Sequence, residues 1–186
     1  MTGLEAALHS DEAEARRAAF ELVISANDEE YRYSIADLED SPFYAQGRGQ
    51  YTTAAGTVYA AEYGGVILRG FLEQYVALSP ESSIPLVAMD GYEMTFGGAE
   101  LFDEEDGRWL LAFEEDGAPL PVDPGYIRVV KIGPDQPNIP GHLAVKMVAE
   151  VQVSGRAFQD FSLSMEGPLS MDLDRSTLES QMAFYG

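Results

Sequence analysis

The side chains whose types could best take part in binding or catalysis lie in one segment, Gly141–Val153 ("GHLAVKMVAEVQV"). His142 is one of two histidines in the sequence, and Lys146 is one of two lysines. Apolar and polar residues alternate along this segment, which predicts a strand with one buried face. Lys146, Glu150 and Gln152 fall on its polar face. Lys146 is therefore either a solvent-facing lysine or a cation that binds an anionic ligand, with His142 beside it.

The residues that most catalytic and metal sites need are missing or few. The chain has no cysteine, which excludes disulfides, thiolate catalysis and thiolate metal ligands. Its two histidines, His9 and His142, cannot form a histidine-rich metal site. Motifs for dinucleotide, phosphate-loop, zinc-protease and serine-hydrolase chemistry are absent. The acidic Asp-Gly loops lack EF-hand spacing, because Phe102 or Ala112 would stand at the first ligand position. Residue chemistry alone therefore indicates an acidic α+β domain.

The charge balance limits the partners. The 186 residues include 32 acidic and 11 basic side chains, for a formal net charge of −21. Such a chain repels phosphate backbones and anionic lipids, so neither nucleic acid nor a membrane is a predicted partner. No apolar stretch approaches the roughly 18 residues that a spanning helix needs. The N-terminus is acidic where a signal peptide would be basic, which predicts a cytoplasmic protein unless the chain is cut from a longer exported one.

Strand signals dominate after a short helical segment. Cap signals at Thr2 and Ser10 predict a helix that ends near Ala19. Residues 20–26 and 108–115 have the composition of strands. Three shorter features are expected: a helix over 35–39, helical spacing over 66–76, and a hairpin turn at Asp90 and Gly91.

We divide the chain into an N-terminal helical segment (1–19), a domain (20–153) and a C-terminal unit (154–186). The C-terminal unit resembles the segment that begins at Phe20, since both have the order strand, turn, strand, short helix. The similarity is either chance or the opening of a second copy of the domain in a tandem repeat. In the second case the unit could mediate self-association.

Four segments, taken in order, resemble the molybdopterin-binding domain of sulfite-oxidase-type oxidoreductases. They are "EYGGVILRGFLEQYV", "VAMDGYEMTF", "LLAFEEDGAPLPVDPGYIRVV" and "GHLAVKMVAEVQV". The third is the most specific, because it is similar to the family's Leu-Ala-Tyr strand, Gly-x-Pro-Leu-Pro turn and Gly-x-x-Arg-Leu-Val strand. The resemblance implies an α+β, mostly β fold with a mixed sheet, preceded here by the N-terminal helix. It also implies a pterin-dithiolene molybdenum cofactor and oxo transfer to or from a small substrate.

The metal ligand of that family has no counterpart here. The molybdenum-ligating cysteine would fall in or near Ala45–Thr53, where this chain has none. In the last segment Leu143 and Met147 stand where the family has arginine and tryptophan, whereas Lys146 matches the family's lysine. The resemblance makes four residues candidates for cofactor binding: Arg48, Tyr92, His142 and Lys146.

Ordinary structural interpretations also apply to Arg48, Arg128 and Trp109. By default Arg48 is an exposed surface residue. Arg48 lies between Gly47 and Gly49, in the glycine-rich loop expected where the family's metal-binding loop would lie, and glycine permits close approach to a ligand. Arg128 is expected on a strand, where a buried ion pair is one interpretation. Trp109 is expected in the core.

Two functional hypotheses follow. The first is a divergent molybdopterin-binding-like oxidoreductase domain that binds a pterin or another anionic small molecule without catalysis of its own. The second is a catalytically silent interaction module that keeps only the fold. The missing cysteine argues against autonomous molybdenum catalysis, so we predict no catalytic residue and no metal ligand. Molybdopterin is a cofactor by resemblance only, and we favour none for this chain alone.

Overall fold

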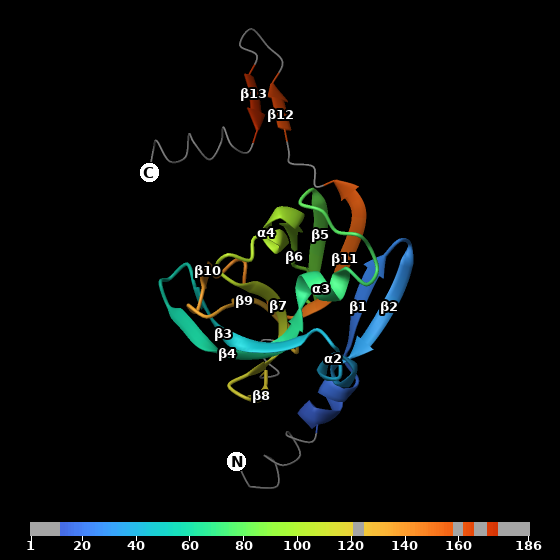
Figure 1. Ribbon diagram of the computed structural model, residues 1–186, viewed down its shortest axis with the longest axis vertical. Helices are drawn as coiled ribbons and strands as arrows, with labels where there is room; N and C mark the ends of the chain where they lie inside the picture. The colour runs from blue at the N-terminus through green and yellow to red at the C-terminus, as the bar shows by residue number, and fades with distance from the viewer. Residues whose placement is uncertain (1–11, 121–124, 158–161, 166–170, 175–186) are drawn as a thin grey trace.

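The computed structural model describes residues 12–120, 125–157, 162–165 and 171–174 (Figure 1). The fold is α+β and mostly β, as the sequence predicts, with two mixed sheets and short helices beside them. Within the described residues, no helix is long and apolar enough to cross a membrane.

The first sheet joins the beginning and the end of the domain. Its strands, in spatial order, are β2 (Glu29–Ser34), β1 (Glu21–Ala26), β11 (Val148–Ala157), β5 (Ser82–Ala88) and β6 (Glu93–Gly97). β1 pairs with β11 in parallel, and the other neighbours are antiparallel. β1 opens the domain and β11 ends it, so their pairing brings the two ends of the domain together in one sheet.

This sheet contains two hairpins, and the second confirms the turn predicted at Asp90 and Gly91. β1 and β2 are joined by Asn27 and Asp28, whose φ angles are 53° and 65°, a conformation that these residues tolerate. At the second turn, Gly91 has a φ of 83°. The side chain of Asp90 accepts a hydrogen bond from the Tyr92 amide at 3.0 Å, which fixes the tip between β5 and β6.

The second sheet curls on itself. Its strands are β10 (Asn138–Pro140), β3 (Tyr44–Thr52), β4 (Val58–Ile67), β7 (Arg108–Glu115) and β8 (Ala118–Pro119), with β9 (Arg128–Ile132) also paired to β7. β3 and β4 form the long curved ribbon in Figure 1. The end of β9 returns to β3, because the Gly133 amide donates to the Arg48 carbonyl at 3.0 Å. The sheet is therefore almost closed.

The segment Ala45–Thr53 is largely strand, so the predicted glycine-rich loop is wrong. β3 pairs with β4 without a break from Tyr44 to Thr52. A Cβ atom on Gly49 would lie 2.3 Å from the Lys131 carbonyl oxygen, and one on Gly47 would lie 3.1 Å from Ile132. The two glycines therefore give β9 room to approach β3. The sequence could not show this, because β9 lies some eighty residues further along the chain.

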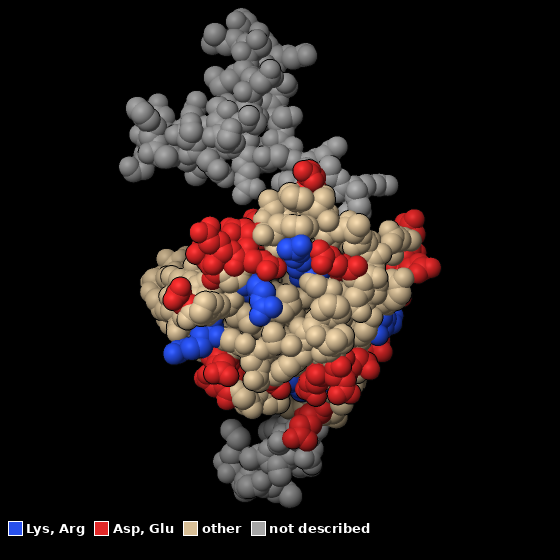
Figure 2. Space-filling view, in the orientation of Figure 1, with Lys and Arg blue, Asp and Glu red and all other residues tan. Residues whose placement is uncertain are grey.

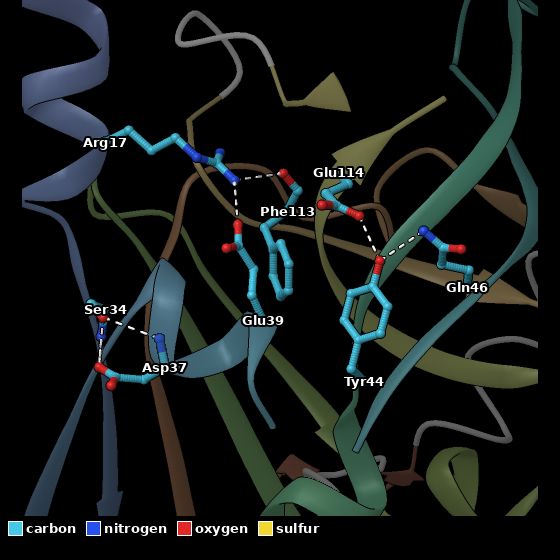
Figure 3. Close-up of polar contacts among 8 residues, drawn as sticks. All are labelled: Arg17, Ser34, Asp37, Glu39, Tyr44, Gln46, Phe113 and Glu114. Carbon is cyan, nitrogen blue, oxygen red and sulfur yellow. Dashed lines mark hydrogen bonds and ion pairs between the residues drawn. The ribbon is translucent and has the colours of Figure 1, made fainter. Parts of the chain in front are cut away.

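The helices are short, and each ends where a strand or a turn takes over. They are the segment 12–18, α2 (Ile35–Glu39), α3 (Leu68–Leu72) and α4 (Gly98–Phe102). The prediction for 35–39 is confirmed, and α2 begins with a capping box between Ser34 and Asp37 (Figure 3). The helical spacing over 66–76 is only partly realised. Val66 and Ile67 pair with β7, and that strand pairing overrides the local helical pattern.

Arg17 attaches the N-terminal helix to the domain (Figure 3). Its Nη2 donates to the Phe113 carbonyl at 3.2 Å and lies 3.8 Å from a carboxylate oxygen of Glu39. Burial lowers the pKa of Arg17, and the charges of Glu39 and Glu114 act in the opposite direction. The helix is therefore held by a charge-assisted bond to β7.

The hydrophobic core has two parts. The larger cluster takes residues from both sheets and the helices, and its fully buried members include Leu22, Leu86, Phe96 and Leu111. The smaller cluster belongs to the curled sheet and consists of Ala61, Tyr63, Leu110, Ala112, Val130 and Ile132. Trp109 is buried, as predicted, and its Nε1 donates to the Glu100 carbonyl at 3.0 Å.

Part of the sequence prediction lies outside the described residues. This holds for the caps at Thr2 and Ser10 and for residues 175–186 of the C-terminal unit. β12 (Ser162–Met165) and β13 (Met171–Asp174) pair with each other in an antiparallel fashion. The tandem repeat and self-association through this unit stay predictions.

Candidate functional site

Three of the four predicted site residues come from segments that meet at one end of the curled sheet. The turn that carries His142 is attached to the end of β3, since the Gly141 amide donates to the Thr52 carbonyl at 2.7 Å. Lys146 forms an antiparallel bridge with Arg128 at the start of β9. The hairpin that carries Tyr92 joins the same region, because the Met89 amide donates to the Met147 carbonyl at 2.8 Å. We call the region around His142, Lys146 and the Tyr92 hairpin the β3 end.

The segment that contains Lys146 is less regular than predicted. The strand expected over 141–153 begins only at Val148, and Ala144 and Val145 are both buried. Met147 has a φ of 59°, a left-handed conformation that interrupts the extended chain. It lies tightly against Gly125, where a Cβ atom would come within 2.6 Å of the Met147 Cα. This approach of two distant segments explains why the alternation fails before Val148.

The three residues at the β3 end face solvent, and Arg48 does not join them. His142 and Lys146 are exposed, and 48% of Tyr92 is accessible. Arg48 lies on β3 directly opposite Glu62 of β4 and is also exposed. It is four positions from Thr52, a distance of about 13 Å along a strand. Exposure agrees with the interpretation of Lys146 as a solvent-facing lysine and leaves it accessible to a ligand.

Arg128 lies beneath the β3 end, and the sequence did not select it as a site residue. Only 4% of it is exposed. Its Nη1 donates to the Tyr51 hydroxyl at 2.9 Å, and its guanidinium lies 5.1 Å from the centre of the Tyr51 ring. The Tyr51 ring stacks in turn on Tyr59, with centroids 5.1 Å apart. Arg128 is buried as expected, and it forms no ion pair with a carboxylate in the part of the chain that the structure describes.

Two buried polar atoms near this arginine lack partners. Neither Arg128 Nε nor the Tyr63 hydroxyl has a hydrogen-bond partner in the described segments. Burial raises the pKa of Tyr63 to about 12, and the charge of Glu115 acts in the same direction while Arg128 opposes it. A buried cation without a counter-charge is costly, and an anion nearby would lower that cost. The β3 end therefore combines a buried positive charge with an exposed lysine in an otherwise acidic molecule.

The β3 end also carries exposed apolar side chains. Among the described residues, the large hydrophobic side chains that are most exposed are Val58, Tyr59, Met89 and Tyr92. Val58 and Tyr59 pair with Thr52 and Tyr51, and the other two lie on the hairpin that contacts Met147. The first pair therefore lies beside the end of β3, and the second lies on the hairpin that is bonded to Met147. Exposed apolar side chains of this size are available to a partner.

The residues present do not fit a thiolate-ligated molybdenum cofactor. The segment in which the cysteine would fall is a strand whose glycines are packed against β9. No group of three or more histidine, aspartate and glutamate side chains in the described ranges is arranged to hold a metal ion. What the β3 end can supply is positive charge and aromatic surface, which suit an anionic ligand.

A second polar cluster lies on the strands and has a structural role. The Tyr44 hydroxyl donates to Glu114 at 2.6 Å and accepts from Gln46 Nε2 at 2.7 Å (Figure 3). Burial raises the pKa of Tyr44 to about 12, and the hydrogen bond to Glu114 acts in the same direction. The hydroxyl therefore stays protonated near neutral pH and cannot act as a base. The spacing of Tyr44 and Gln46, two residues apart on one strand face, was the available sequence signal.

One surface groove contains none of the predicted site residues. It has a volume of about 600 Å³ and lies over β1, β11 and the β1–β2 turn. Glu150 is held there by hydrogen bonds from Ser25 Oγ at 2.7 Å and Gln152 Nε2 at 3.1 Å. The other charged lining residues are Asp28, Glu29 and Glu30, so this groove does not suit an anionic ligand.

Comparison with known proteins supports the fold. No protein-family profile and no curated protein matches the chain. The crystal structure of the sulfane dehydrogenase SoxCD from Paracoccus pantotrophus is similar, with a TM-score of 0.61 and 17% sequence identity. The match covers 84% of this chain and 45% of that one, so this chain spans less than half the length of its structural neighbour. The α+β fold of the sulfite-oxidase type is thus confirmed, as a likeness of fold alone.

Proposed function

We propose that this chain is a binding domain without catalysis of its own, and that it takes an anionic small molecule at the β3 end. The observation that carries the proposal is Arg128, a buried cation with no carboxylate partner among the described residues. Lys146 is exposed and bridges Arg128, and His142 is exposed in the turn that is attached to the end of β3. Tyr92 adds an aromatic surface at the rim.

The electrostatics favour this end over the rest of the surface. Figure 2 shows acidic side chains spread over the visible face, with few basic ones among them. Elsewhere most arginines are neutralised, as Arg32 is by Glu30 at 2.8 Å and Arg69 by Glu73 at 3.0 Å. Among the described residues, neither Arg128 nor Lys146 forms an ion pair with a carboxylate. An anion that approaches the β3 end would therefore meet positive charges that no described ion pair neutralises.

The phosphate of a pterin is one anion that the family resemblance suggests. A flat pterin ring could lie on an exposed tyrosine such as Tyr92, and its phosphate could accept hydrogen bonds from Lys146. The chain provides no thiolate, so we derive no metal chemistry and no redox step. Binding, orientation and release are the steps that its own residues can perform.

The first experiment measures loading. The protein is expressed in a host that makes the cofactor, and bound molybdenum is measured by elemental analysis and bound pterin by fluorescence after denaturation. Stoichiometric pterin supports the proposal, and stoichiometric molybdenum would overturn the conclusion that the metal cofactor does not fit.

A second experiment uses an exposed-charge control. Titration with inorganic phosphate and with a pterin phosphate, followed by amide NMR, should shift signals of residues 141–147. Lys146→Gln should weaken binding roughly fivefold or more, because a charge-assisted hydrogen bond is lost. Arg48→Gln, which removes an equal charge outside the β3 end, should change it little. Equal effects of the two substitutions would contradict a site at Lys146.

The alternative is an interaction module that keeps only the fold. It is favoured by the exposed apolar side chains Val58, Tyr59, Met89 and Tyr92. If neither phosphate nor pterin binds to the well-folded chain, this alternative replaces the first. The substitution of Tyr59 and Met89 by serine would then abolish partner binding without loss of stability.

A further inference from the structure

A second groove lies at the other end of the β3–β4 ribbon. It has a volume of about 430 Å³ and is lined by the start of β3, the end of β4, α3 and the start of β7. Tyr44, which lines this groove, and Thr52 at the β3 end are eight residues apart on one strand, which corresponds to about 25 Å. The groove is thus separate from the β3 end, and it falls in the size range of small-molecule sites.

The two arginines of the groove, Arg69 and Arg108, differ in their ion pairing. The Arg69 guanidinium lies 3.9 Å from the centre of the Phe102 ring. It donates from Nε to Glu73 at 3.0 Å, and its Nη1 is 3.6 Å from Glu104. Arg108 is exposed and forms no ion pair with any residue that the structure describes. One arginine is therefore held in place, and the other is free to bind a ligand.

The apolar part of the groove is preformed. Phe43 packs against α3 at a position that only glycine allows, because a Cβ atom on Gly70 would lie 2.8 Å from the Phe43 ring. The same ring makes an edge contact with Phe71, at 6.4 Å between centroids. Ile67 is half-buried beside it, with its amide donating to the Phe43 carbonyl at 2.9 Å. A ligand would meet a surface that needs little reorganisation.

We propose that this groove binds a small zwitterion of the α-amino-acid class with an apolar side chain. The carboxylate binds Arg108, the ammonium faces Glu104 and Glu73, and the side chain rests on Phe43 and Ile67. The charged lining residues are two arginines and two glutamates, so the groove itself is neutral. Basic side chains lie in the middle of the face that carries α3 and α4, with acidic ones around them (Figure 2).

The choice of a zwitterion follows from the charges that line the groove. A net anion would meet Glu73 and Glu104 at close range, and a net cation would leave Arg108 without an opposite charge. A zwitterion has no net charge, and each of its groups finds an opposite charge in the groove. Because α-amino acids carry both groups on one carbon, they match charges that line a single small groove.

The experiment titrates the full chain with L-phenylalanine and follows amide NMR signals, with those of Ala45 and Gly70 as reporters. N-acetyl-L-phenylalanine lacks the ammonium and L-phenylalaninamide lacks the carboxylate, so both should bind more weakly than the free amino acid. Arg108→Gln should weaken binding of L-phenylalanine roughly tenfold, because it removes a charge-assisted hydrogen bond. Arg48→Gln removes an exposed arginine outside the groove and should leave binding unchanged.

Three results would each overturn the proposal. The first is the absence of saturable shifts at Ala45 and Gly70 up to the solubility limit of L-phenylalanine. The second is binding of the amide as tight as that of the free amino acid. The third is an equal loss of affinity in the Arg108 and Arg48 variants. The readout is local to the groove, so failure at the β3 end would leave this test unaffected.

Discussion

The substitution Gly49→Ala tests whether the glycine-rich segment is structural. In the structure a Cβ atom at this position would lie 2.3 Å from the Lys131 carbonyl oxygen and 3.6 Å from Ile132 Cγ2. The first atom is backbone in a strand that pairs with β7, so it cannot move without loss of that pairing. If the segment were a loop built to approach a ligand, alanine would reduce ligand binding and leave the fold intact.

The expected cost is large for a single methyl group. Overpacking of a core commonly costs 1–3 kcal/mol, and a contact with backbone belongs at the upper end, so we expect about 3 kcal/mol or more. For a chain of this size that corresponds to a fall of roughly 6–12 °C in the thermal midpoint. Gly97→Ala is the matched control, because nothing lies within 4 Å of its Cβ position. This control changes only the glycine at the N-cap of α4, and we expect it to lower the free energy of unfolding by about 1 kcal/mol or less.

The assay is equilibrium unfolding in urea, with the thermal midpoint measured alongside. If Gly49→Ala lowers the free energy of unfolding no more than Gly97→Ala does, the structural role of Gly49 is refuted. In that case β9 would not approach β3 as closely as described. That result would support the interpretation of the segment as a ligand-binding loop.

Three further predictions concern stability. Because the pKa of Tyr63 is raised to about 12 in the folded protein, the free energy of unfolding should be about 1.4 kcal/mol lower at pH 11 than at pH 8. The contribution of Tyr63 to stability is complete below pH 10 and is lost as the pH rises toward 12. Urea unfolding of Tyr63→Phe should lack this part of the alkaline loss. Ser34→Ala should cost about 1 kcal/mol through the lost bond to the Asp37 amide, seen as a midpoint fall of roughly 2–4 °C. Arg17→Ala should cost about 1–2 kcal/mol by urea unfolding, since it removes a bond to a buried strand carbonyl. Arg16→Ala, which removes only an exposed pair, should cost less than about 0.5 kcal/mol.

The parts of the fold that could be predicted are those with a local cause. The strand at 108–115, the helix at 35–39 and the turn at Asp90 and Gly91 each depend on residues within a few positions of one another. The candidate site was predicted less completely. His142, Lys146 and Tyr92 come from segments that meet, whereas Arg48 lies elsewhere on β3.

Arg128 shows why the site could not be completed from the sequence. Its position on a strand suggested burial, and a buried ion pair was one interpretation. In the structure its hydrogen-bond partner is Tyr51, 77 residues away, and that contact exists only because β3 and β9 approach each other in the curled sheet. Sequence separation of this size carries no information about which side chain will meet the arginine.

By itself, the sequence determined the strand content, the hairpin turns, the strong negative charge and the lack of any thiolate, because these are properties of composition and of neighbouring residues. Only the tertiary structure decided the role of Gly47 and Gly49, the break at Met147 and the lack of a counter-charge for Arg128 in the described segments. Each depends on how closely two distant segments approach. That distance is set by packing of the whole sheet and leaves no mark on the local pattern.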